Sequence, residues 1–552
     1  DRPVPDAVTL EVFRHLFTAL TEEMGAALRR AAFSPNIKER RDYSCALFDP
    51  RGAVVAQGDH MPVHLGAMPM SVRAALDELG ALAPGDVALL NDPFRGGTHL
   101  PDITAIAAVH TDPPEPALLG YVASRAHHSD VGGSAPGSMP LAREIFEEGV
   151  RIPPVRLRTA GTPNEDVRRL ILANVRTPVE RAGDLDAQLA ALHAGSRRLL
   201  ELVDRRGHDA VRTAMRGLVT YSDRLVARGL GRIPDGRYRA ADRMEDDGFE
   251  SGPVEIRVAL ESRGERLVVD FDGTDPQVPG GINAVAAITA SATRYVVRCV
   301  VEALLGESLP AGGGSMEAVE LRLPPGTLVD ARPPASVAAG NVETSQRITD
   351  VLIRAFAEAL PDLMPALSQG TMNNTTVGGP DPRGGPPFAY YETVGGGMGA
   401  GPGGPGLSGV HVHMSNSLNT PVEALEHAYP FRVERYALRR GTGGAGRHRG
   451  GDGLRRDLRL LGPARVTLLT ERRGAGPSGA RGGGAGSPGE NVLVRDGVET
   501  PLPGKVTFDA RAGDVVSVRS PGGGGWGAPD DAEAPPLRDR DRPWDLNPLE
   551  PS

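Results

Sequence analysis

Two short apolar runs separated by a proline-rich break constrain the fold more than any other stretch of this chain. Residues 103–109 and 118–123 are apolar and strand-like, and residues 111–116 between them read TDPPEP. Proline fixes φ and has no N–H to donate to a neighbouring strand, so the break predicts a turn. We therefore expect an antiparallel β-hairpin, in which residues just before the first strand meet residues just after the second.

Histidine and aspartate residues gather at the open end of this predicted hairpin. His99 and Asp102 precede the first strand, and the segment SRAHHSD, after the second strand, contains His127, His128 and Asp130. Neutral imidazole and carboxylate groups are the side chains that bind a catalytic divalent metal. The two groups of residues therefore predict a site for metal binding or acid–base chemistry. The structural alternative is hydrogen bonding at the end of a sheet.

Composition limits the class of protein. The chain has 552 residues, 40% of them hydrophobic, which is enough for several domains or one large multi-layer body. A net charge of −9 argues against nucleic acid as a partner. Two cysteines cannot form a disulfide framework. No apolar run reaches the ~18 residues of a membrane span, and no signal-like segment opens the sequence, so we expect a cytoplasmic protein without membrane contact.

Periodicity predicts the other elements. Apolar residues recur at helical spacing over residues 6–33, and Pro5 and Asp6 suit the start of that helix. We expect a hairpin over residues 43–57, a loop over 60–70, a helix over 71–79, two or three helices within 166–230, strands within 240–274, helices over 288–305 and 345–360, the last capped by Thr344 or Ser345, and a strand-rich, glycine-rich part from 370 to about 526.

These elements describe an α+β protein: a large multi-layer mixed body with an N-terminal helix, a metal-bearing β-hairpin region, a helical middle and a β-rich, glycine-rich C-terminal part. The residues after Pro529 are rich in proline and charge, which predicts a mobile tail. The expected segments are residues 1–165 (α/β, with the metal site), 166–235 (helical), 236–370 (α/β), 371–528 (β-rich) and 529–552 (tail).

A glycine- and arginine-rich segment, GGAGRHRGGDG at residues 443–453, is similar to a phosphate-binding loop. It lacks the Gly-Lys-Ser/Thr ending and the strand-to-helix setting of such loops. We therefore interpret it, and the arginine-rich residues 432–481 around it, as ordered turns between strands. A flexible arginine–glycine segment that binds nucleic acid is the alternative.

Several long motifs resemble one known family. AQGDHMPVHLGAMP, GDVALLNDPFRGGTHLPDI, ASRAHHSDVGG and EIFEEGVRIPPVRL, together with RVERYALRRGTGGAGRHRGGDG, are similar to the hydantoinase B family. That family includes the N-methylhydantoinase B subunit, the matching half of 5-oxoprolinase and the α subunit of acetone carboxylase. The resemblance extends from Val8 to about Trp526.

The resemblance implies a partner, a cofactor and a ligand set. Family members assemble with a hydantoinase A-type ATPase of actin-like fold, which binds ATP and phosphorylates the substrate, so a hetero-oligomer is expected. The B-type subunit carries a divalent metal, which we expect to be Mn, Zn or Fe. By resemblance the ligands fall on Asp42, His99, Asp102 and His127, with Asp130 as a further candidate and His128 lining the same site. The assignment of Asp42 as a metal ligand rests on the resemblance alone.

The chemistry that follows is ATP-dependent hydrolysis of a cyclic amide such as a hydantoin, 5-oxoproline or a lactam. Amides are poor electrophiles, and phosphorylation of the carbonyl oxygen activates them. A metal held by imidazole and carboxylate can then lower the pKa of water. His128 or Asp92 is the expected general base.

Two other functions remain open from the sequence. The first is an acetone-carboxylase-like α subunit, a ligase with the same metal and a third, small subunit. The second is a scaffold that only assembles with the ATPase half. The set of histidines and aspartates around the hairpin argues against the scaffold.

Overall fold

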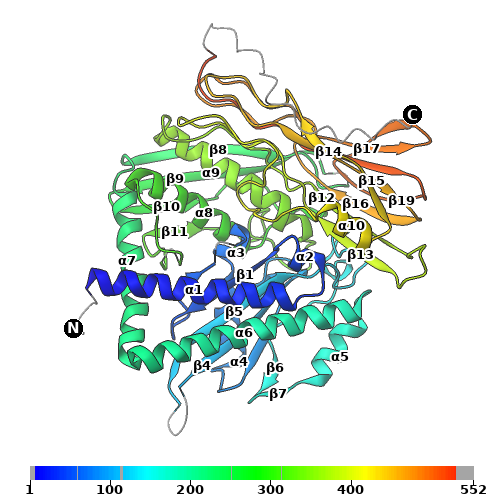
Figure 1. Ribbon diagram of the computed structural model, residues 1–552. Coiled ribbons are helices and arrows are strands. Elements are labelled where there is room, and N and C mark those ends of the chain that lie inside the picture. The colour runs from blue at the N-terminus through cyan, green and yellow to red at the C-terminus, as the bar shows by residue number, and fades with distance from the viewer. Residues whose placement is uncertain (1–5, 59, 112–115, 250, 313, 530–552) are drawn as a thin grey trace, which may run out of the picture.

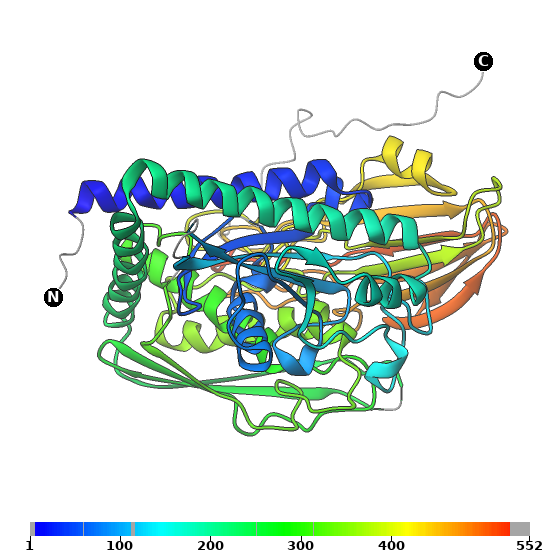
Figure 2. The ribbon, with the colours of Figure 1, turned by 90° about the horizontal axis from the view of Figure 1, so that it is seen from below.

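The computed structural model describes residues 6–58, 60–111, 116–249, 251–312 and 314–529. Strands in these ranges form four sheets with helices packed between and over them, which confirms the predicted α+β class (Figure 1). Residues 530–552 of the predicted tail and residues 112–115 of the predicted turn lie outside the described residues. Seen from below, two long helices, a large sheet, a second helix layer and a smaller sheet follow one another (Figure 2).

The large sheet has seven strands in the order β2-β1-β5-β4-β3-β6-β7. The predicted hairpin lies at its centre, where β4 and β5 pair antiparallel. Both strands are longer than predicted: β4 begins at Asp102, and β5 ends at His127. These two residues are partners in the register. The strands are β1 (Tyr43–Phe48), β2 (Val54–Gln57), β3 (Val87–Leu90), β4 (Asp102–His110), β5 (Leu118–His127), β6 (Val155–Thr159) and β7 (Thr162–Pro163).

Helices α1 (Ala7–Ala31) and α6 (Pro178–Arg206) lie side by side over one face of this sheet (Figures 1 and 2). Helix α1 begins where the sequence predicts, because the Asp6 carboxylate accepts a hydrogen bond from a backbone N–H three residues later at 2.9 Å. The two helices approach closely at Gly195, where a Cβ atom would lie 2.5 Å from the Met24 sulfur. The short helix α2 (Pro35–Lys38) follows α1.

A second helix layer covers the opposite face of the sheet. It contains α3 (Pro62–Leu65), α4 (Met68–Leu79), α8 (Ala286–Leu305) and α9 (Ser345–Ala359). The loop predicted over residues 60–70 was wrong, because α3 and α4 begin within it. Pro62 and Pro69 occupy the first turns of these helices, where the missing N–H of proline removes no helical hydrogen bond.

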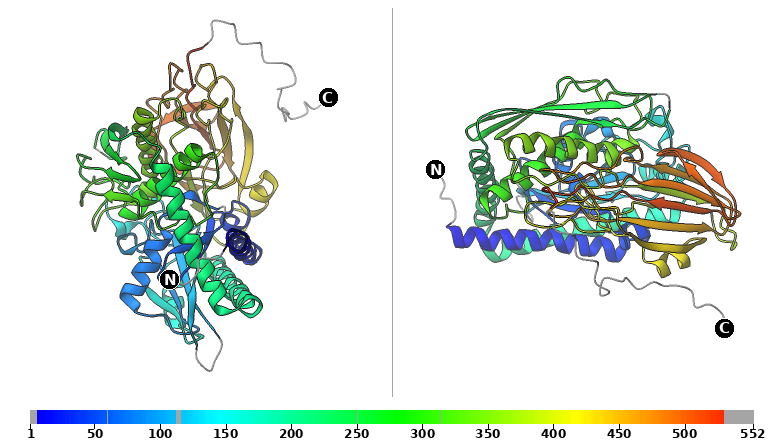
Figure 3. Two further views of the ribbon diagram at one scale, coloured as in Figure 1. Left: turned by 90° about the vertical axis from the view of Figure 1, so that its left-hand side faces the viewer. Right: turned by 90° about the horizontal axis from the view of Figure 1, so that it is seen from above.

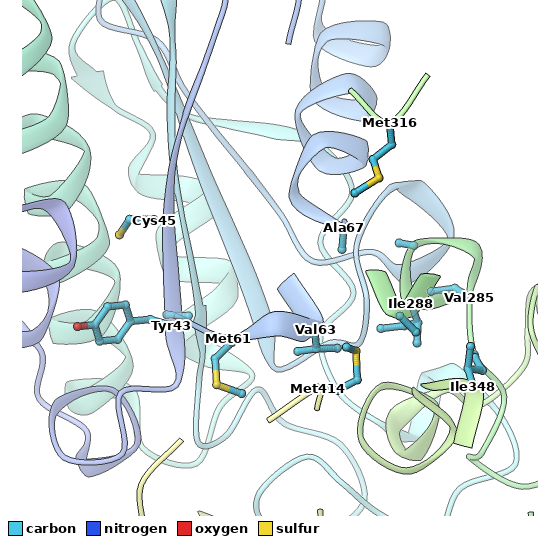
Figure 4. Packing of buried hydrophobic residues seen from close by; sticks show 14 of the residues in the cluster. Tyr43, Cys45, Met61, Val63, Ala67, Val285, Ile288, Met316, Ile348 and Met414 are labelled. Carbon is cyan, nitrogen blue, oxygen red and sulfur yellow. The ribbon is translucent and has the colours of Figure 1, made fainter. Parts of the chain in front are cut away.

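The core around α3 joins segments that are far apart in the sequence (Figure 4). Val63 belongs to one buried cluster with Ile288 of α8 and Ile348 of α9. Its backbone N–H also donates to the carbonyl oxygen of Met414 at 3.3 Å. These contacts fix α3, and with it His64, against the middle and the C-terminal part of the chain.

The outer layer is a four-stranded sheet in the order β11-β10-β9-β8, and α9 packs on it. Helix α7 (His208–Leu230) runs across the layers at one end of the body (Figure 3). Together with α5 and α6 it forms the helical middle, for which the sequence predicts two or three helices. The elements are α5 (Glu165–Ala173), α7 (His208–Leu230), β8 (Gly236–Met244), β9 (Val254–Arg263), β10 (Arg266–Asp270) and β11 (Val319–Arg322), with two 3₁₀ turns earlier in the chain, η1 (Pro93–Arg95) and η2 (Ile145–Glu147).

The start of α9 differs from the prediction. A π-helical turn, η3 (Gly340–Thr344), runs directly into α9, so neither Thr344 nor Ser345 is a side-chain N-cap. The Thr344 hydroxyl donates to the carbonyl oxygen of Ile282, and the Ser345 hydroxyl donates to that of Asn341 at 2.6 Å. A side-chain cap forms where the chain leaves helical geometry, and here the chain is still helical at both residues.

The C-terminal part is β-rich, as predicted, with two sheets in the orders β13-β12-β16-β19 and β14-β15-β20-β17-β18. The glycine-rich residues 443–453 are ordered turns that pack backbone against backbone. Gly444 N–H donates to the carbonyl oxygen of Gly523 at 2.8 Å, and a Cβ atom at Gly450 would lie 2.0 Å from that same oxygen. The elements are β12 (Asn374–Gly379), β13 (Phe388–Glu392), α10 (Val422–Ala428), β14 (Phe431–Arg439), β15 (Gly453–Leu460), β16 (Ala464–Leu469), β17 (Glu490–Arg495), β18 (Val498–Leu502), β19 (Lys505–Ala510) and β20 (Val515–Arg519).

One large hydrophobic core extends through the first sheet, both helix layers and the outer sheet. It draws residues from α1 near the start of the chain and from β16 near its end. None of the helices in the described ranges combines the length and the apolar character that crossing a bilayer requires.

Truncation of a core residue of α1 tests this layered packing. Phe17 is fully buried, so Phe17→Ala should lower the free energy of unfolding by about 3–5 kcal/mol. Val8 lies on the same helix with 75% of its surface exposed, and Val8→Ala should change it by less than about 0.5 kcal/mol. Urea denaturation followed by circular dichroism measures both, and equal midpoints for the two variants would contradict the packing of α1.

Candidate metal centre

The register of the central hairpin brings three potential metal ligands together. Asp102 opens β4 and His127 closes β5, and His99 lies in the turn that leads into β4. His99 Nε2 lies 3.2 Å from Asp102 Oδ2, and His127 Nδ1 lies 3.6 Å from Asp102 Oδ1. One ligand atom from each of the three residues falls within 4.8 Å of the others. We call these three residues the triad.

Burial and charge in the triad suit a divalent cation. All three side chains are buried, and His99 Nδ1, Asp102 Oδ1 and His127 Nε2 have no hydrogen-bond partner among the described residues. Burial opposes the charged form of Asp102, but the imidazoles of His99 and His64 hold its pKa well below the usual range. Burial, aided by His99, lowers the pKa of His127 well below its usual value. A charged carboxylate beside a neutral imidazole is the protonation state that binds metal.

Asp42 lies at the edge of the triad. Its Oδ2 is 3.9 Å from His127 Nδ1, and its backbone carbonyl accepts a hydrogen bond from His127 N–H at 3.0 Å. Burial raises the pKa of the Asp42 carboxyl, and the nearby Asp102 charge adds to that rise. The residue identified by resemblance alone is therefore a neighbour of the triad.

His64 is a site residue that the sequence reasoning missed. It lies on α3, and its Nε2 is 3.5 Å from Asp102 Oδ2, while its Nδ1 shares a hydrogen bond of 2.8 Å with the Ser44 hydroxyl. The motif HMPVHLGAMP contains His64, but the sequence carries no local sign that α3 packs against the open end of the hairpin.

The contacts of His128 and Asp130 lie away from the triad. His128 Nε2 forms a 2.9 Å hydrogen bond with Gln188 Oε1 on α6. Both Asp130 oxygens accept hydrogen bonds from Arg176, through its backbone N–H at 3.1 Å and its guanidinium at 3.0 Å, and others come from glycine N–H groups. Successive residues of an extended chain point to opposite sides, so the residue after His127 faces α6.

The contacts of Asp92, the other expected base, also lie elsewhere. Its carboxylate accepts a hydrogen bond from Phe94 N–H at 3.0 Å and so caps the turn η1. The guanidinium groups of Arg95 and Arg151 lie 3.7 and 3.6 Å from it. Burial raises its pKa, and the Phe94 N–H and the two arginines oppose that rise.

Two elements from the second half of the chain complete the surroundings. The Asn341 amide of η3 lies 3.1 Å from His99 Nε2. The Tyr391 ring of β13 stacks on His127, with 4.1 Å between ring centroids and 13° between planes.

A hydrogen-bonded chain connects η3 to that tyrosine. Glu343 Oε1 accepts a hydrogen bond from Asn374 Nδ2 at 2.8 Å, and Asn374 Oδ1 accepts one from the Tyr391 hydroxyl at 2.8 Å. Glu343 is fully buried, which raises the pKa of its carboxyl to about 8. The site is thus assembled from the hairpin, α3, η3 and β13.

Comparison with known proteins gives one family over almost the whole chain. A family model described as Hydantoinase B/oxoprolinase matches residues 6–529. The chain is 38% identical to 5-oxoprolinase 1 of Arabidopsis thaliana over 95% of its own length, and it spans only 42% of that longer protein. It is 31% identical to caprolactamase subunit beta of Pseudomonas jessenii, and the match covers 95% of this chain and 91% of that one.

Two solved structures have the same fold. The crystal structure of ATP-dependent caprolactamase from Pseudomonas jessenii superposes with a TM-score of 0.86 at 29% identity, covering 95% of this chain and 92% of that one. A nucleotide-free acetone carboxylase structure superposes with a TM-score of 0.82 at 18% identity, covering 96% of this chain and 78% of that one. At that identity the second likeness shows the fold alone.

Metal analysis tests the triad. We expect about one Mn, Zn or Fe per chain in the purified protein and loss of that metal in Asp102→Asn, because the amide of asparagine is a far weaker ligand than a carboxylate. His128→Asn should keep the metal, because His128 bonds Gln188 instead. Elemental analysis by plasma mass spectrometry measures all three proteins. A full metal content in Asp102→Asn would rule the triad out as the binding site.

The buried Glu343 carboxyl should make stability depend on pH. Its pKa is raised from 4.5 to about 8 in the folded state, so unfolding between these values releases a proton. The free energy of unfolding should therefore fall as pH rises from about 4.5 to 8, by up to about 1.4 kcal/mol per pH unit from this group. Above about pH 8 this contribution should stop changing.

Glu343→Gln should remove that part of the pH dependence, whereas Glu358→Gln, on the exposed face of α9, should leave it in place. Urea unfolding at several pH values between 5 and 8 compares the slopes of the three proteins. Parallel slopes for wild type and Glu343→Gln would show that Glu343 ionises normally.

Proposed function

Because the chain belongs to the hydantoinase B/oxoprolinase family, we propose that it is the metal-dependent subunit of an ATP-dependent cyclic-amide hydrolase. The substrate is a hydantoin, 5-oxoproline or a lactam, and a hydantoinase A-type partner phosphorylates it with ATP. This chain then completes the hydrolysis. The observation that carries the proposal is the buried triad at the end of the central hairpin.

The relatives support a reaction that is shared between two proteins, or between two halves of one longer protein. The caprolactamase relative is a beta subunit of an enzyme described as ATP-dependent. The chain spans about two fifths of 5-oxoprolinase 1, so the activity of that protein draws on parts that this chain does not match. Both points favour an ATP-binding partner for this chain.

The residues of the site have distinct proposed roles. His99, Asp102 and His127 would hold the metal, and His64 and Tyr391 orient Asp102 and His127 through the contacts described above. A divalent cation held there supplies Lewis acidity, which lowers the pKa of water and polarises the reacting carbon–oxygen bond. Burial of the whole set excludes bulk water and strengthens electrostatic interactions within the site.

Asp42 is the proposed general base, in place of His128 and Asp92, whose contacts lie elsewhere. Water adds to the activated carbon, and Asp42 takes the proton of that water. Asp42 then returns the proton to the ring nitrogen as the carbon–nitrogen bond breaks. A second water displaces phosphate from the acyl phosphate that remains, which gives the ring-opened acid.

The carboxylase alternative has less support than the hydrolase function. Its support is the likeness to acetone carboxylase at 18% identity, which concerns the fold and not the reaction. The scaffold alternative leaves three buried, mutually close metal-type ligands without a role.

Reconstitution tests the proposed function. The chain is combined with a hydantoinase A-type partner, ATP, Mn²⁺ and a panel of hydantoins, 5-oxoproline and lactams, and ring-opened product is measured by mass spectrometry. Asp102→Asn should lower the rate by about a thousand-fold, since the metal contributes several kcal/mol to the transition state. His110→Gln, a change at the far end of β4, is the matched control and should keep the wild-type rate.

The outcomes separate the candidate functions. Ring opening that needs both chains and ATP supports the proposal. ATP consumption only with a ketone and bicarbonate would replace it with the carboxylase function. Wild-type rates in Asp102→Asn would show that the triad takes no part in the reaction.

A further inference from the structure

Hydrogen bonds and close backbone packing hold the π-helical turn η3 beside the triad. Gly340 N–H donates to the carbonyl oxygen of Gly281 at 3.0 Å, and a Cβ atom at Gly340 would lie 1.9 Å from the carbonyl oxygen of Asn283. The Ser345 hydroxyl bonds the carbonyl oxygen of Asn341. Single π turns within helices are rare and frequently occur at functional sites. The local backbone therefore fixes the direction in which the Asn341 side chain leaves the helix.

Asn341 has one buried polar atom without a hydrogen-bond partner in the part of the chain that the structure describes. The residue is only 4% exposed, and its Oδ1 has no hydrogen-bond partner among the described residues. The other end of the amide contacts His99 Nε2, the ring nitrogen that faces Asp102. A cation held by His99 and Asp102 would occupy the lone pair of that nitrogen. In the metal-loaded protein the donor and the acceptor of Asn341 would then both be free.

A free, buried carboxamide is costly unless a ligand satisfies it, since each unsatisfied polar group costs about 1–3 kcal/mol. The ligand must offer a donor and an acceptor side by side. The amide of a small ring is held cis, so its N–H and C=O lie on one edge. The tetrahedral adduct formed when water adds to the activated ring also carries an N–H and an oxygen on adjacent atoms. A primary carboxamide can pair with such an edge through two hydrogen bonds.

We propose that Asn341 is a substrate-binding and specificity-determining residue: its Oδ1 accepts from the ring N–H, and its Nδ2 donates to the oxygen on the reacting carbon. A linear trans amide can form only one of these two hydrogen bonds. A ring that is methylated on the reacting nitrogen also loses one. The site therefore selects cyclic amides with a free N–H. This inference rests on the proposed function and names the feature of the substrate that the site recognises.

Binding measurements without ATP test this recognition separately from catalysis. The full chain is loaded with Mn²⁺, and calorimetric titration measures the affinity for lactams of five to seven ring atoms and for their N-methyl derivatives. Wild type should bind the N–H lactams about 10-fold more tightly than the N-methyl forms, as expected for one hydrogen bond. Asn341→Leu, of similar size, should bind the N–H lactams about 10- to 100-fold more weakly and lose the discrimination.

Two further variants keep the test decisive. Asn341→Asp retains the acceptor and loses the donor, so it should still prefer N–H over N-methyl lactams. Thr349→Val removes a buried hydroxyl on α9 whose hydrogen bond within the described ranges goes to the Ser345 carbonyl oxygen, and it should bind as wild type does. Metal content and melting temperature are measured for every variant, so that loss of fold or of metal is recognised.

The outcomes separate this inference from the proposed function. Equal lactam affinities for wild type and Asn341→Leu, at equal metal content, would overturn the role of Asn341 while leaving ATP-dependent hydrolysis intact. A wild-type chain that binds no lactam of the panel would also overturn it. The proposed function fails separately, by the absence of ATP-dependent ring opening in the reconstituted pair.

Discussion

The pairing of Asp102 with His127 across β4 and β5 is the constraint on which the rest of the site depends. The two residues lie at the same end of adjacent antiparallel strands, so the backbone ladder itself sets their separation. A slip of one residue in that register would turn one of the two side chains to the other face of the sheet. The long, buried strands behind the pair hold the register, because both faces of the sheet are covered by helices.

Burial on both faces gives this end of the sheet its chemistry. A carboxylate and imidazoles at a solvated sheet end would be satisfied by water. Here the helix layers exclude water, so burial and the imidazoles of His99 and His64 shift the pKa of Asp102, while burial and His99 lower the pKa of His127. Low polarity also makes each remaining unpaired atom significant. Asp102 Oδ1 and Asn341 Oδ1 are two such atoms among the described residues, and both belong to side chains that contact His99 or His127.

The glycine-rich C-terminal part packs backbone against backbone and contributes residues to the site. Its turns pack directly against one another at distances that no side chain would permit, as at Gly450. Strands β12 and β13 belong to the same part of the chain and supply Asn374 and Tyr391 behind His127. The abundance of glycine, which could indicate flexibility in isolation, here reflects close contact between ordered loops.

The sequence by itself determined the central hairpin, the long helices, the β-rich C-terminal part and the pairing of His99 and Asp102 with His127. These features follow from local rules: prolines that enforce a turn, periodicities of two and 3.6 residues, and an antiparallel ladder that joins two short clusters. Only the tertiary structure decided that His64 and Asn341 belong beside Asp102 and His99. Likewise, only the tertiary structure shows that His128 bonds Gln188 of α6 and that Asp130 bonds Arg176. The physical reason is that such contacts join residues up to 242 positions apart, and they depend on how whole layers pack and not on any pattern along the chain.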